Sequence, residues 1–402
     1  MRAVSCSTLV TCAVESLPAG GGLEADPVHD GVVAWDGDAV VYAGSRTGWD
    51  GDIDEARDGC TVVPGFVDCH THLPFMGWRD DEFEGRLHGR TYRELHEEGG
   101  ISRSARMLAQ ASDDEVLAFC RPLLSEMLAQ GTTALELKTG YGLSVEAELR
   151  QARLARRLAE EAPQTATVTL LACHAVPPDI TREGWVDTVC AELIPRAARE
   201  GLVDAVDVYV EDIAFSVEDL RRVAEAAAAA RLSLRCHADQ LGPSGAAAAA
   251  ASLGARSADH LNHAGSDAGA ALAGAGTVAV LLPASTLMLG AQPPPVSALA
   301  AAGTALAVAT DFNPGTSAVL SMPLAVSLGC ALYGLSPGAA LVAATANPAW
   351  VLGLQERVGS LEPGKRADFL VLEGHDFRMV PYRPGHDPVL DVFVAGERIS
   401  GR

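Results

Sequence analysis

The chain has 402 residues, enough to bury a large core, so a small disulfide-stapled module is excluded. Its residues are 48% hydrophobic, but no apolar run approaches the ~18 residues of a membrane helix and no basic, apolar leader opens the chain. The formal net charge of −22 argues against nucleic acid and other polyanionic partners, so we expect a cytoplasmic globular protein.

Both ends of the chain are predicted to be rich in β-structure. The segment GVVAWDGDAVVYAG at 31–44 alternates apolar and polar residues around Asp36 and Gly37, which is a strong hairpin signal. ADFLVLEG at 367–374 and DVFVAGERI at 391–399 have the pattern of short strands with glycine turns. We expect residues 1–63 and 354–402 to form one small β-sandwich together.

Between these ends, residues 64–353 alternate short apolar segments with helical patterns, as a parallel βα array requires. Ser112 with Glu115 and Ser216 with Asp219 have the spacing of capping boxes, which mark helix starts. The predicted strands are VPGFVDCH, ALELKTG, TVTLLACHA, AVDVYVE, LSLRCHAD, RSADHL, TVAVLLP and ALAVATD. Eight such units predict a (β/α)₈ barrel with its active site at the C-terminal ends of the strands.

Nearly every predicted strand ends on a polar residue. In chain order these residues are His70 and His72, Tyr141, His174, Glu211, His237, His260 and Asp311. On a strand, residues i and i+2 point to the same side, so His70 and His72 can both face the barrel axis and converge on one ion. The same parity points Cys69, Cys173 and Cys236 outward, where they are expected to be reduced, buried thiols.

A single histidine at a strand end is more often structural than functional. Here His70, His72, His237, His260 and Asp311 follow strands 1, 5, 6 and 8, and the joint pattern changes that interpretation. Imidazole and carboxylate ligands suit Zn²⁺ or iron acting on a water molecule. The residues alone therefore predict a metal-dependent hydrolase.

At this point the chain resembles the amidohydrolase superfamily, in which HxH, a later histidine and an aspartate bind a metal. More specifically, seven segments resemble the imidazolonepropionase family in order and spacing: GFVDCHTHLPFMGWRDDEF, LELKTGYGL, ACHAVPP, HADQ, SADHL, ATDFNPGTS and ATANPAWVLGL. The resemblance covers about 290 residues and continues weakly into both ends.

The resemblance implies one Zn²⁺ or iron ion per subunit, held by His70, His72, His237 and Asp311. It implies that Arg79, Tyr92, Tyr141, His174, Gln240, Asn313, Gly315 and Thr316 contact the substrate. Tyr92 is expected in a loop over the site, with helix packing as its alternative role. Lys138 does not match the position of the carboxylated lysine in binuclear relatives, so a single metal is expected and Lys138 is predicted to form a salt bridge beneath it.

The implied reaction is hydrolysis of the cyclic amide of 4-imidazolone-5-propanoate to N-formimino-L-glutamate, in histidine degradation. Arg79 would bind the substrate carboxylate, although its sequence context alone predicts a surface ion pair with Asp80 or Asp81. His174 would stabilise the oxyanion, and His260 with Asp311 would move the proton. Gln240 cannot titrate, so it is assigned to orienting water or the substrate.

Two loops depart from the family pattern, namely LLPASTLMLGAQPPP after strand 7 and EEGGISRS before residue 105. Both are expected at the barrel mouth, where they affect substrate identity more than reaction type. The open alternative is another mononuclear amidohydrolase or deaminase acting on a related cyclic amide, formimino compound or heterocyclic amine. The resemblance also implies a homodimer.

Overall fold

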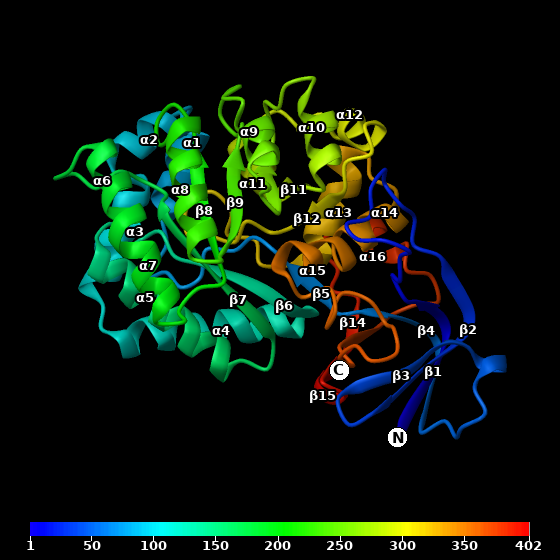
Figure 1. Cartoon of the computed structure of the whole chain (residues 1–402). Helices are drawn as coiled ribbons and strands as arrows, with labels where there is room; N and C mark the ends of the chain where they lie inside the picture. The colour runs from blue at the N-terminus through cyan, green and yellow to red at the C-terminus, as the bar shows by residue number, and fades with distance from the viewer. Residues whose placement is uncertain (402) are drawn as a thin grey trace.

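The computed structural model describes residues 1–401, without the side chain of Glu98. Its strands form two sheets, one of seven strands and one of eight. In Figure 1 the eight-stranded sheet and its helices fill the upper left, whereas the seven-stranded sheet and both termini lie at the lower right. The predicted division at residues 63/64 and 353/354 stays a prediction.

The small sheet joins both ends of the chain, as predicted. Its strands lie in the order β15 (Glu397–Gly401), β14 (Val389–Val394), β13 (Phe369–Leu372), β4 (Glu55–Pro64), β1 (Arg2–Val10), β2 (Pro27–Asp36) and β3 (Ala39–Ser45). The predicted hairpin is β2–β3, which pairs Asp36 with Ala39. Trp35 packs edge-on against Phe369 and Phe393, which buries the aromatic core of this sheet. The strands belong to one hydrogen-bonded sheet.

The large sheet contains the eight strands that the sequence predicts, all parallel and in chain order. They are β5 (Phe66–Asp68), β6 (Thr132–Lys138), β7 (Thr165–Cys173), β8 (Ala205–Val210), β9 (Ser233–Ala238), β10 (Ser257–His260), β11 (Val278–Leu281) and β12 (Leu306–Val308). The first and last strands meet through an isolated parallel bridge between Thr71 and Phe312, and Thr310 donates from its backbone N to Asp68 Oδ1 at 3.1 Å. These contacts bring the two edges of the sheet together, so the barrel is nearly closed.

Helices cover the outside of the barrel between consecutive strands (Figure 1). In the first half they are α1 (Asp80–Leu87), α2 (Tyr92–Glu98), α3 (Gly100–Gln110), α4 (Asp113–Ala129), α5 (Val145–Glu161), α6 (Arg182–Thr188) and α7 (Ile194–Arg199). A π-helical turn, η2 (Val189–Leu193), joins α6 to α7. In the second half they are α8 (Val217–Ala229), α9 (Ala246–Ser252), α10 (Ala268–Ala275), α11 (Pro283–Leu289) and α12 (Val296–Ala301). Three helices follow the last barrel strand, namely α13 (Met322–Tyr333), α14 (Pro337–Ala343) and α15 (Ala346–Leu352), and α16 (Met379–Tyr382) lies between β13 and β14 of the small sheet. A single 3₁₀ turn, η1 (Arg46–Gly48), follows β3.

Helix starts follow the chemistry of their first residues. The two predicted capping boxes are present, because Ser112 and Ser216 each exchange hydrogen bonds with the residue three positions later. A third box, Thr91 with Glu94, begins α2 and makes Tyr92 its first residue. The prediction that Tyr92 lies in a loop was therefore wrong, because the capping box of Thr91 and Glu94 starts a helix at Tyr92.

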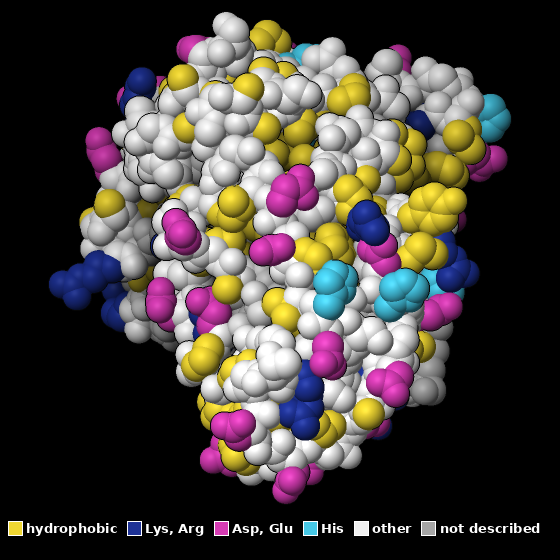
Figure 2. Space-filling view, turned by 90° about the vertical axis from the view of Figure 1, so that its right-hand side faces the viewer, with side chains coloured by type: hydrophobic (Ala, Val, Ile, Leu, Met, Phe, Trp, Pro, Cys, Tyr) yellow, Lys and Arg dark blue, Asp and Glu magenta, His cyan; other side chains and the backbone are white. Residues whose placement is uncertain are grey.

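The outer surface carries dispersed charge. Figure 2 shows acidic side chains spread over the face of the small sheet, interspersed with hydrophobic and basic ones. Among the described residues, none of the helices has both the length and the apolar character needed to cross a bilayer. All nine cysteines are free, and Cys69, Cys173 and Cys236 are buried, as expected.

Candidate active site

The predicted metal ligands come together at the C-terminal ends of the barrel strands. His70 and His72 follow β5, His237 lies in β9, and Asp311 follows β12. Oδ1 of Asp311 lies 3.3 Å from Nε2 of His72 and 3.5 Å from Nε2 of His70, and all four residues are buried. The rings of His70 and His237 have centroids 4.5 Å apart. Asp311 has a φ of 54°, a left-handed conformation that non-glycine residues adopt rarely and that clusters at functional sites.

Two further carboxylates hold the histidine rings from behind. Nδ1 of His70 lies 2.6 Å from Oδ2 of Asp259, in the range of a strong hydrogen bond. Nδ1 of His237 lies 3.0 Å from Oδ2 of Asp207, an ion-pair distance without the angles of a hydrogen bond. Carboxylates in these positions direct Nε2 of both rings toward the site, as in many metalloenzymes.

The donor set fits a metal ion. Nε2 of His70 and Nε2 of His237 are buried and have no hydrogen-bond partner among the described residues, although buried polar atoms are nearly always satisfied. The donor atoms of His70, His72 and Asp311 lie within 4.8 Å of one another. Imidazole nitrogens with one carboxylate are the ligand set that zinc and iron accept.

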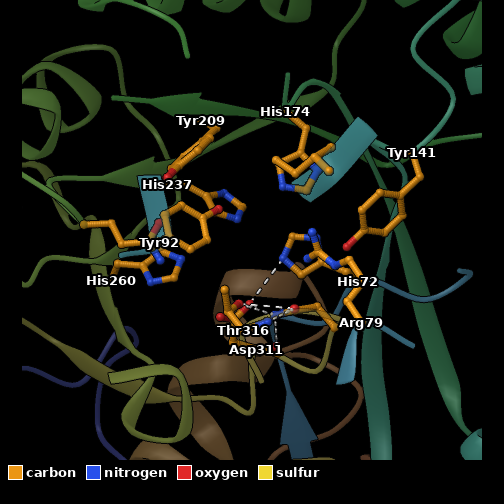
Figure 3. A pocket seen from close by; sticks show the side chains of 13 residues that line it. His72, Arg79, Tyr92, Tyr141, His174, Tyr209, His237, His260, Asp311 and Thr316 are labelled. Carbon is orange, nitrogen blue, oxygen red and sulfur yellow. Dashed lines mark hydrogen bonds and ion pairs between the residues drawn. The ribbon is translucent and has the colours of Figure 1, made fainter. Parts of the chain in front are cut away.

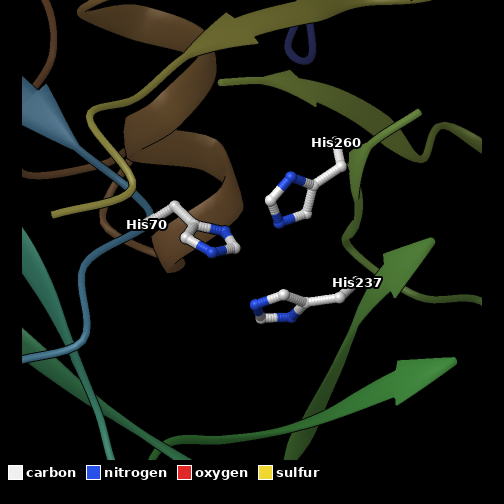
Figure 4. A group of neighbouring side chains, drawn as sticks. All are labelled: His70, His237 and His260. Atoms are coloured by element: carbon white, nitrogen blue, oxygen red, sulfur yellow. The ribbon is translucent and has the colours of Figure 1, made fainter. Parts of the chain in front are cut away.

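His260 adds a fourth imidazole to this cluster. Figure 4 shows its ring facing those of His70 and His237, and the donor atoms of these three residues also lie within 4.8 Å of one another. His260 ends β10 with a φ of 75°, so it shares the left-handed conformation of Asp311. The two residues invoked for proton transfer thus both have a backbone that ordinary strand residues avoid.

Burial keeps these imidazoles neutral. It is the largest cause that lowers the pKa of His70, His72 and His174, and it lowers the pKa of His260 to about 3. A neutral imidazole keeps the lone pair that a metal requires. Burial alone would raise the pKa of Asp311, but His72, His260 and His237 face its carboxylate and lower it overall.

A pocket opens above the cluster and gathers most of the predicted substrate contacts. Figure 3 shows its side chains converging from several strands, with the His72–Asp311 contact at its centre. The lining residues are His72, Arg79, Tyr92, Ile101, Tyr141, His174, Tyr209, His237, Gln240, His260, Asp311, Asn313 and Thr316. His70 and Gly315 are not part of this lining, but the ring of His70 lies 5.2 Å from that of His72 and Gly315 lies against Arg79.

Arg79 is a buried cation with few partners. It is 4% exposed; its Nη1 lies 3.5 Å from Oε2 of Glu82, and its Nε has no hydrogen-bond partner. The guanidinium lies against Gly315, where any β-carbon would overlap it. Asp81 binds Arg103 at 2.7 Å instead, so the surface ion pair that sequence context alone predicted for Arg79 is not formed. A buried, under-paired guanidinium in a pocket is suited to a carboxylate.

The loop after β12 is organised by Asn313. Its Oδ1 accepts hydrogen bonds from the backbone N of Gly315 at 2.9 Å and of Thr316 at 2.7 Å, while its Nδ2 donates to the carbonyl of Asp311 at 2.6 Å. Nδ2 also donates to Oγ1 of Thr316 at 2.8 Å. The Asn313 amide is therefore occupied in holding Asp311 and Gly315 in place, although it also lines the pocket.

Helix α5 holds the loop that presents Tyr141. Oε1 of Gln151 accepts from the backbone N of Tyr141 at 2.9 Å, and Oε1 of Glu148 accepts from Gly142 N at 2.7 Å. His174 stacks on His72 with ring centroids 5.2 Å apart, and its Nδ1 lies 3.2 Å from the Gly140 carbonyl. That contact leaves Nε2 of His174 available to the pocket.

Gln240 is positioned by Glu211, whose Oε1 accepts from the backbone N of Gln240 at 2.5 Å and of Leu241 at 2.8 Å. Glu211 thus fixes the segment after β9. Burial raises the pKa of Glu211 to about 7.

Sequence reasoning missed two lining residues, Tyr209 and Ile101. Tyr209 pairs in register with His237 across β8 and β9, so it shares the inward-facing side of the barrel. The signal for Tyr209 was present, since it stands two residues after the inward-facing Asp207. Ile101 is the second residue of α3, and the sequence does not show where this helix packs against the barrel.

Comparisons with known proteins agree with this geometry. The model of the amidohydrolase family matches residues 61–399. The imidazolonepropionase of Rhizorhabdus wittichii is 43% identical over 378 residues, which cover 92% of this chain and 94% of that protein. The imidazolonepropionase of Rubrobacter xylanophilus is 46% identical over 340 residues, which cover 84% of this chain and 81% of that protein.

Solved structures share the fold at much lower identity. A zinc-bound adenosine deaminase from Xanthomonas campestris has a TM-score of 0.72 at 18% identity, covering 99% of this chain and 92% of that one. Guanine deaminase from E. coli has a TM-score of 0.70 at 18% identity, with 100% of both chains covered. These two show the architecture alone, whereas the family match and the relatives above 40% identity show kinship. The chain belongs to the imidazolonepropionases of the amidohydrolase family.

Proposed function

We propose that this chain hydrolyses the cyclic amide of 4-imidazolone-5-propanoate to N-formimino-L-glutamate, a step of histidine degradation. One observation carries the proposal: a buried, under-paired Arg79 lines the same pocket as a convergent group of histidines and Asp311. That pocket offers a cation for a carboxylate tail and a hydrolytic centre for a ring.

His70, His72, His237 and Asp311 would hold one Zn²⁺ or iron ion. Such an ion supplies Lewis-acid polarisation of a carbonyl and acidification of a coordinated water. The chain's own contribution is to aim Nε2 of His70 and His237 into the site through Asp259 and Asp207.

The substrate tail is assigned to Arg79. Its carboxylate would replace the missing partners of the guanidinium and form charge-assisted hydrogen bonds, each worth about 1.5–3 kcal/mol. Tyr141 is buried at the same end of the pocket and would add a hydroxyl donor. With the tail fixed there, the ring is directed toward the histidine cluster (Figure 3).

Hydrolysis adds water across the ring C–N bond, so one proton must pass from the attacking water to the leaving nitrogen. Oδ1 of Asp311 faces His70 and His72, which leaves Oδ2 to take that proton. His260 is neutral and close to the cluster, so its ring can pass the proton on. Nδ1 of the neutral His174 must donate to the Gly140 carbonyl, so its Nε2 would accept a hydrogen bond from a substrate N–H rather than donate to the developing oxyanion, and the amide of Gln240 would orient the ring.

The alternative is deamination of a formimino compound or a heterocyclic amine, as carried out by other members of this fold. Such chemistry commonly uses an acid at the position of Gln240, and an amide there cannot exchange a proton. Gln240 therefore favours hydrolysis of a cyclic amide. Release of ammonia would distinguish the alternative directly.

We further propose that the chain acts in the cytoplasm as a homodimer. Nine free cysteines fit a reducing compartment. The exposed Met379 and Tyr382 of α16, 37% and 77% exposed, provide apolar surface of the kind that subunit contacts use. Light scattering on the purified protein would measure the oligomeric state.

The deciding experiment mixes the purified, metal-loaded protein with freshly generated 4-imidazolone-5-propanoate and follows its ultraviolet absorbance. We expect loss of substrate well above spontaneous decay, abolished by a chelator, with formiminoglutamate identified by mass spectrometry. Substrate decay at the spontaneous rate in a metal-replete sample would refute the proposed substrate. Ammonia without formiminoglutamate would establish the alternative.

A further inference from the structure

Tyr209 is a buried tyrosine on the wall of the pocket, and the proposed reaction assigns it no role. It lies in β8 between Val208 and Val210, which are buried on the outer face of the strand, so its side chain points to the barrel interior. Its ring centroid lies 5.7 Å from that of His237 and 6.1 Å from that of His174. Tyr209 thus stands beside a candidate metal ligand and a candidate substrate contact.

The Tyr209 hydroxyl has no hydrogen-bond partner among the described residues, although the side chain is only 2% exposed. Buried tyrosine hydroxyls normally find a partner, and leaving one unsatisfied costs about 1–3 kcal/mol. A phenylalanine would fill the same space without that cost. After burial, Tyr92 is the neighbour that contributes most to the raised pKa of Tyr209, so the two phenols lie close together, but their geometry does not meet that of a hydrogen bond.

The hydroxyl is available as a donor. Burial raises the pKa of Tyr209 well above its ordinary value, so the phenol keeps its proton. A phenol also has lone pairs, so it can accept from a ring N–H as well.

The position of Tyr209 decides which part of a substrate it can reach. In Figure 3 Tyr209 and Arg79 lie at opposite ends of the pocket, with the histidine rings between them. When a carboxylate tail binds Arg79, the part of the substrate near Tyr209 is the ring, because the ring must approach His72 and His237 to react.

We propose that the Tyr209 hydroxyl hydrogen-bonds a heteroatom of the substrate ring and makes the site selective for nitrogen heterocycles that carry a carboxylate tail. This inference rests on the proposed function, which supplies the ring and the tail. Tyr209 is a specificity residue that touches the substrate, distinct from the groups that hold the metal or move the proton.

The test compares Tyr209→Phe with the wild type in calorimetric binding of two stable ligands. Imidazole-4-propionate has the ring nitrogens and the tail, whereas 3-cyclopentylpropionate has the same tail and ring size without ring heteroatoms. We expect Tyr209→Phe to weaken imidazole-4-propionate about 3- to 10-fold, the value of one lost hydrogen bond, and to leave 3-cyclopentylpropionate unchanged. Equal effects on both ligands, or none on imidazole-4-propionate, would overturn the proposal.

Two further readouts exclude a structural role. Metal content should equal that of the wild type, and the thermal midpoint should stay the same or rise, because an unsatisfied hydroxyl has been removed. The matched control is Tyr42→Phe, whose hydroxyl donates to the Ser45 carbonyl at 2.6 Å in the small sheet. That control should lower the midpoint and leave both affinities unchanged.

The outcome separates this inference from the proposed function. If the wild type fails to turn over 4-imidazolone-5-propanoate but Tyr209→Phe weakens imidazole-4-propionate and leaves 3-cyclopentylpropionate unchanged, the reaction is wrong and the ring contact stands. If the wild type turns the substrate over and Tyr209→Phe binds both ligands as the wild type does, the reaction stands and Tyr209 has no role in specificity.

Discussion

Nζ of Lys138 lies 2.7 Å from Oδ2 of Asp207, and the same oxygen lies 3.0 Å from Nδ1 of His237. Lys138 also lies 2.8 Å from Oε2 of Glu136, and all of these groups are buried. The lysine therefore does form the salt bridge beneath the site that the sequence predicts. It also holds the carboxylate that orients a candidate metal ligand.

Replacing Lys138 by Met should weaken zinc binding about 10- to 100-fold, because Asp207 loses the cation that fixes it behind His237. Stability should fall too, since Asp207 loses its buried counter-charge, whereas Glu136 keeps Arg235. A competition titration with a chromophoric chelator measures the affinity. Lys365→Met is the control, because Lys365 pairs with Glu362 away from the barrel interior. If Lys138→Met does not fold, Asp207→Asn tests the same relationship; unchanged zinc affinity in a folded variant would contradict it.

His237 and His260 should separate metal binding from proton transfer. His237→Ala should lose the metal and activity together, because it removes a ligand. His260→Ala should keep a stoichiometric metal while kcat falls about 10²- to 10⁴-fold, the usual contribution of general acid–base catalysis. Elemental mass spectrometry and steady-state kinetics on the same samples measure both. Metal retained by His237→Ala would remove His237 from the ligand set, and metal lost from His260→Ala would make His260 a ligand.

The sequence predicts the barrel well because nearly every strand is a short apolar run closed by a polar residue; β11, which continues into Leu282 and Pro283, is the exception among β5 to β12. Parity along a strand also places His70 and His72 together. It could equally have identified Tyr209, which stands two residues after Asp207 in β8. The sequence favoured Glu211 instead, because it is the polar residue directly after β8.

Other features of the site depend on contacts that no local pattern contains. The amide of Asn313 is occupied by its own loop, which follows from the turn that the loop adopts. The burial of Arg79 depends on Gly315, a residue more than 200 positions away in the chain. Local sequence cannot show that these two segments pack together, so it favoured an exposed ion pair.

Arg79→Ala should raise KM about 10- to 150-fold with little change in metal content, because it removes a carboxylate contact worth about 1.5–3 kcal/mol. Steady-state kinetics on 4-imidazolone-5-propanoate measures the effect. Arg93→Ala is the control, since Arg93 is exposed and pairs with Asp212 at 2.8 Å. An unchanged KM would remove Arg79 from the substrate site.

Gly315→Ala should reproduce much of that KM effect while Arg79 is still present. A β-carbon at this position would overlap the guanidinium, which must then move out of the place where it meets the tail. Kinetics should show a raised KM, and a crystal structure should show Arg79 displaced. The control is Gly274→Ala, because a β-carbon at Gly274 meets nothing within 4 Å. Gly303→Ala is not suitable, because the φ of 83° at Gly303 would add backbone strain. A normal KM in Gly315→Ala would mean that the loop after β12 yields without moving the arginine.

Asp368 lies where the small sheet meets the barrel, and it should make the stability of the protein depend on pH. Its carbonyl accepts from Gly65 N at 3.0 Å, between β4 and β5, and its Oδ1 accepts from Ala395 N at 2.7 Å. Burial raises the pKa of Asp368 to about 6, and Oδ2 has no partner.

Because the pKa is raised on folding, the protonated form stabilises the folded state fully below about pH 4, the ordinary value, and this contribution is lost as the pH rises through about 6. The difference corresponds to about 3 kcal/mol, or a midpoint shift of about 4 °C for a chain of this size. Asp368→Asn should remove this part of the pH dependence. The thermal midpoint of the variant should therefore rise relative to that of the wild type as the pH increases from 4 to 7. Asp391→Asn is the control, since Asp391 pairs with Arg57 at 2.6 Å in the same sheet. Parallel pH profiles for wild type and Asp368→Asn would show that Asp368 ionises in the folded protein as it does in the unfolded chain.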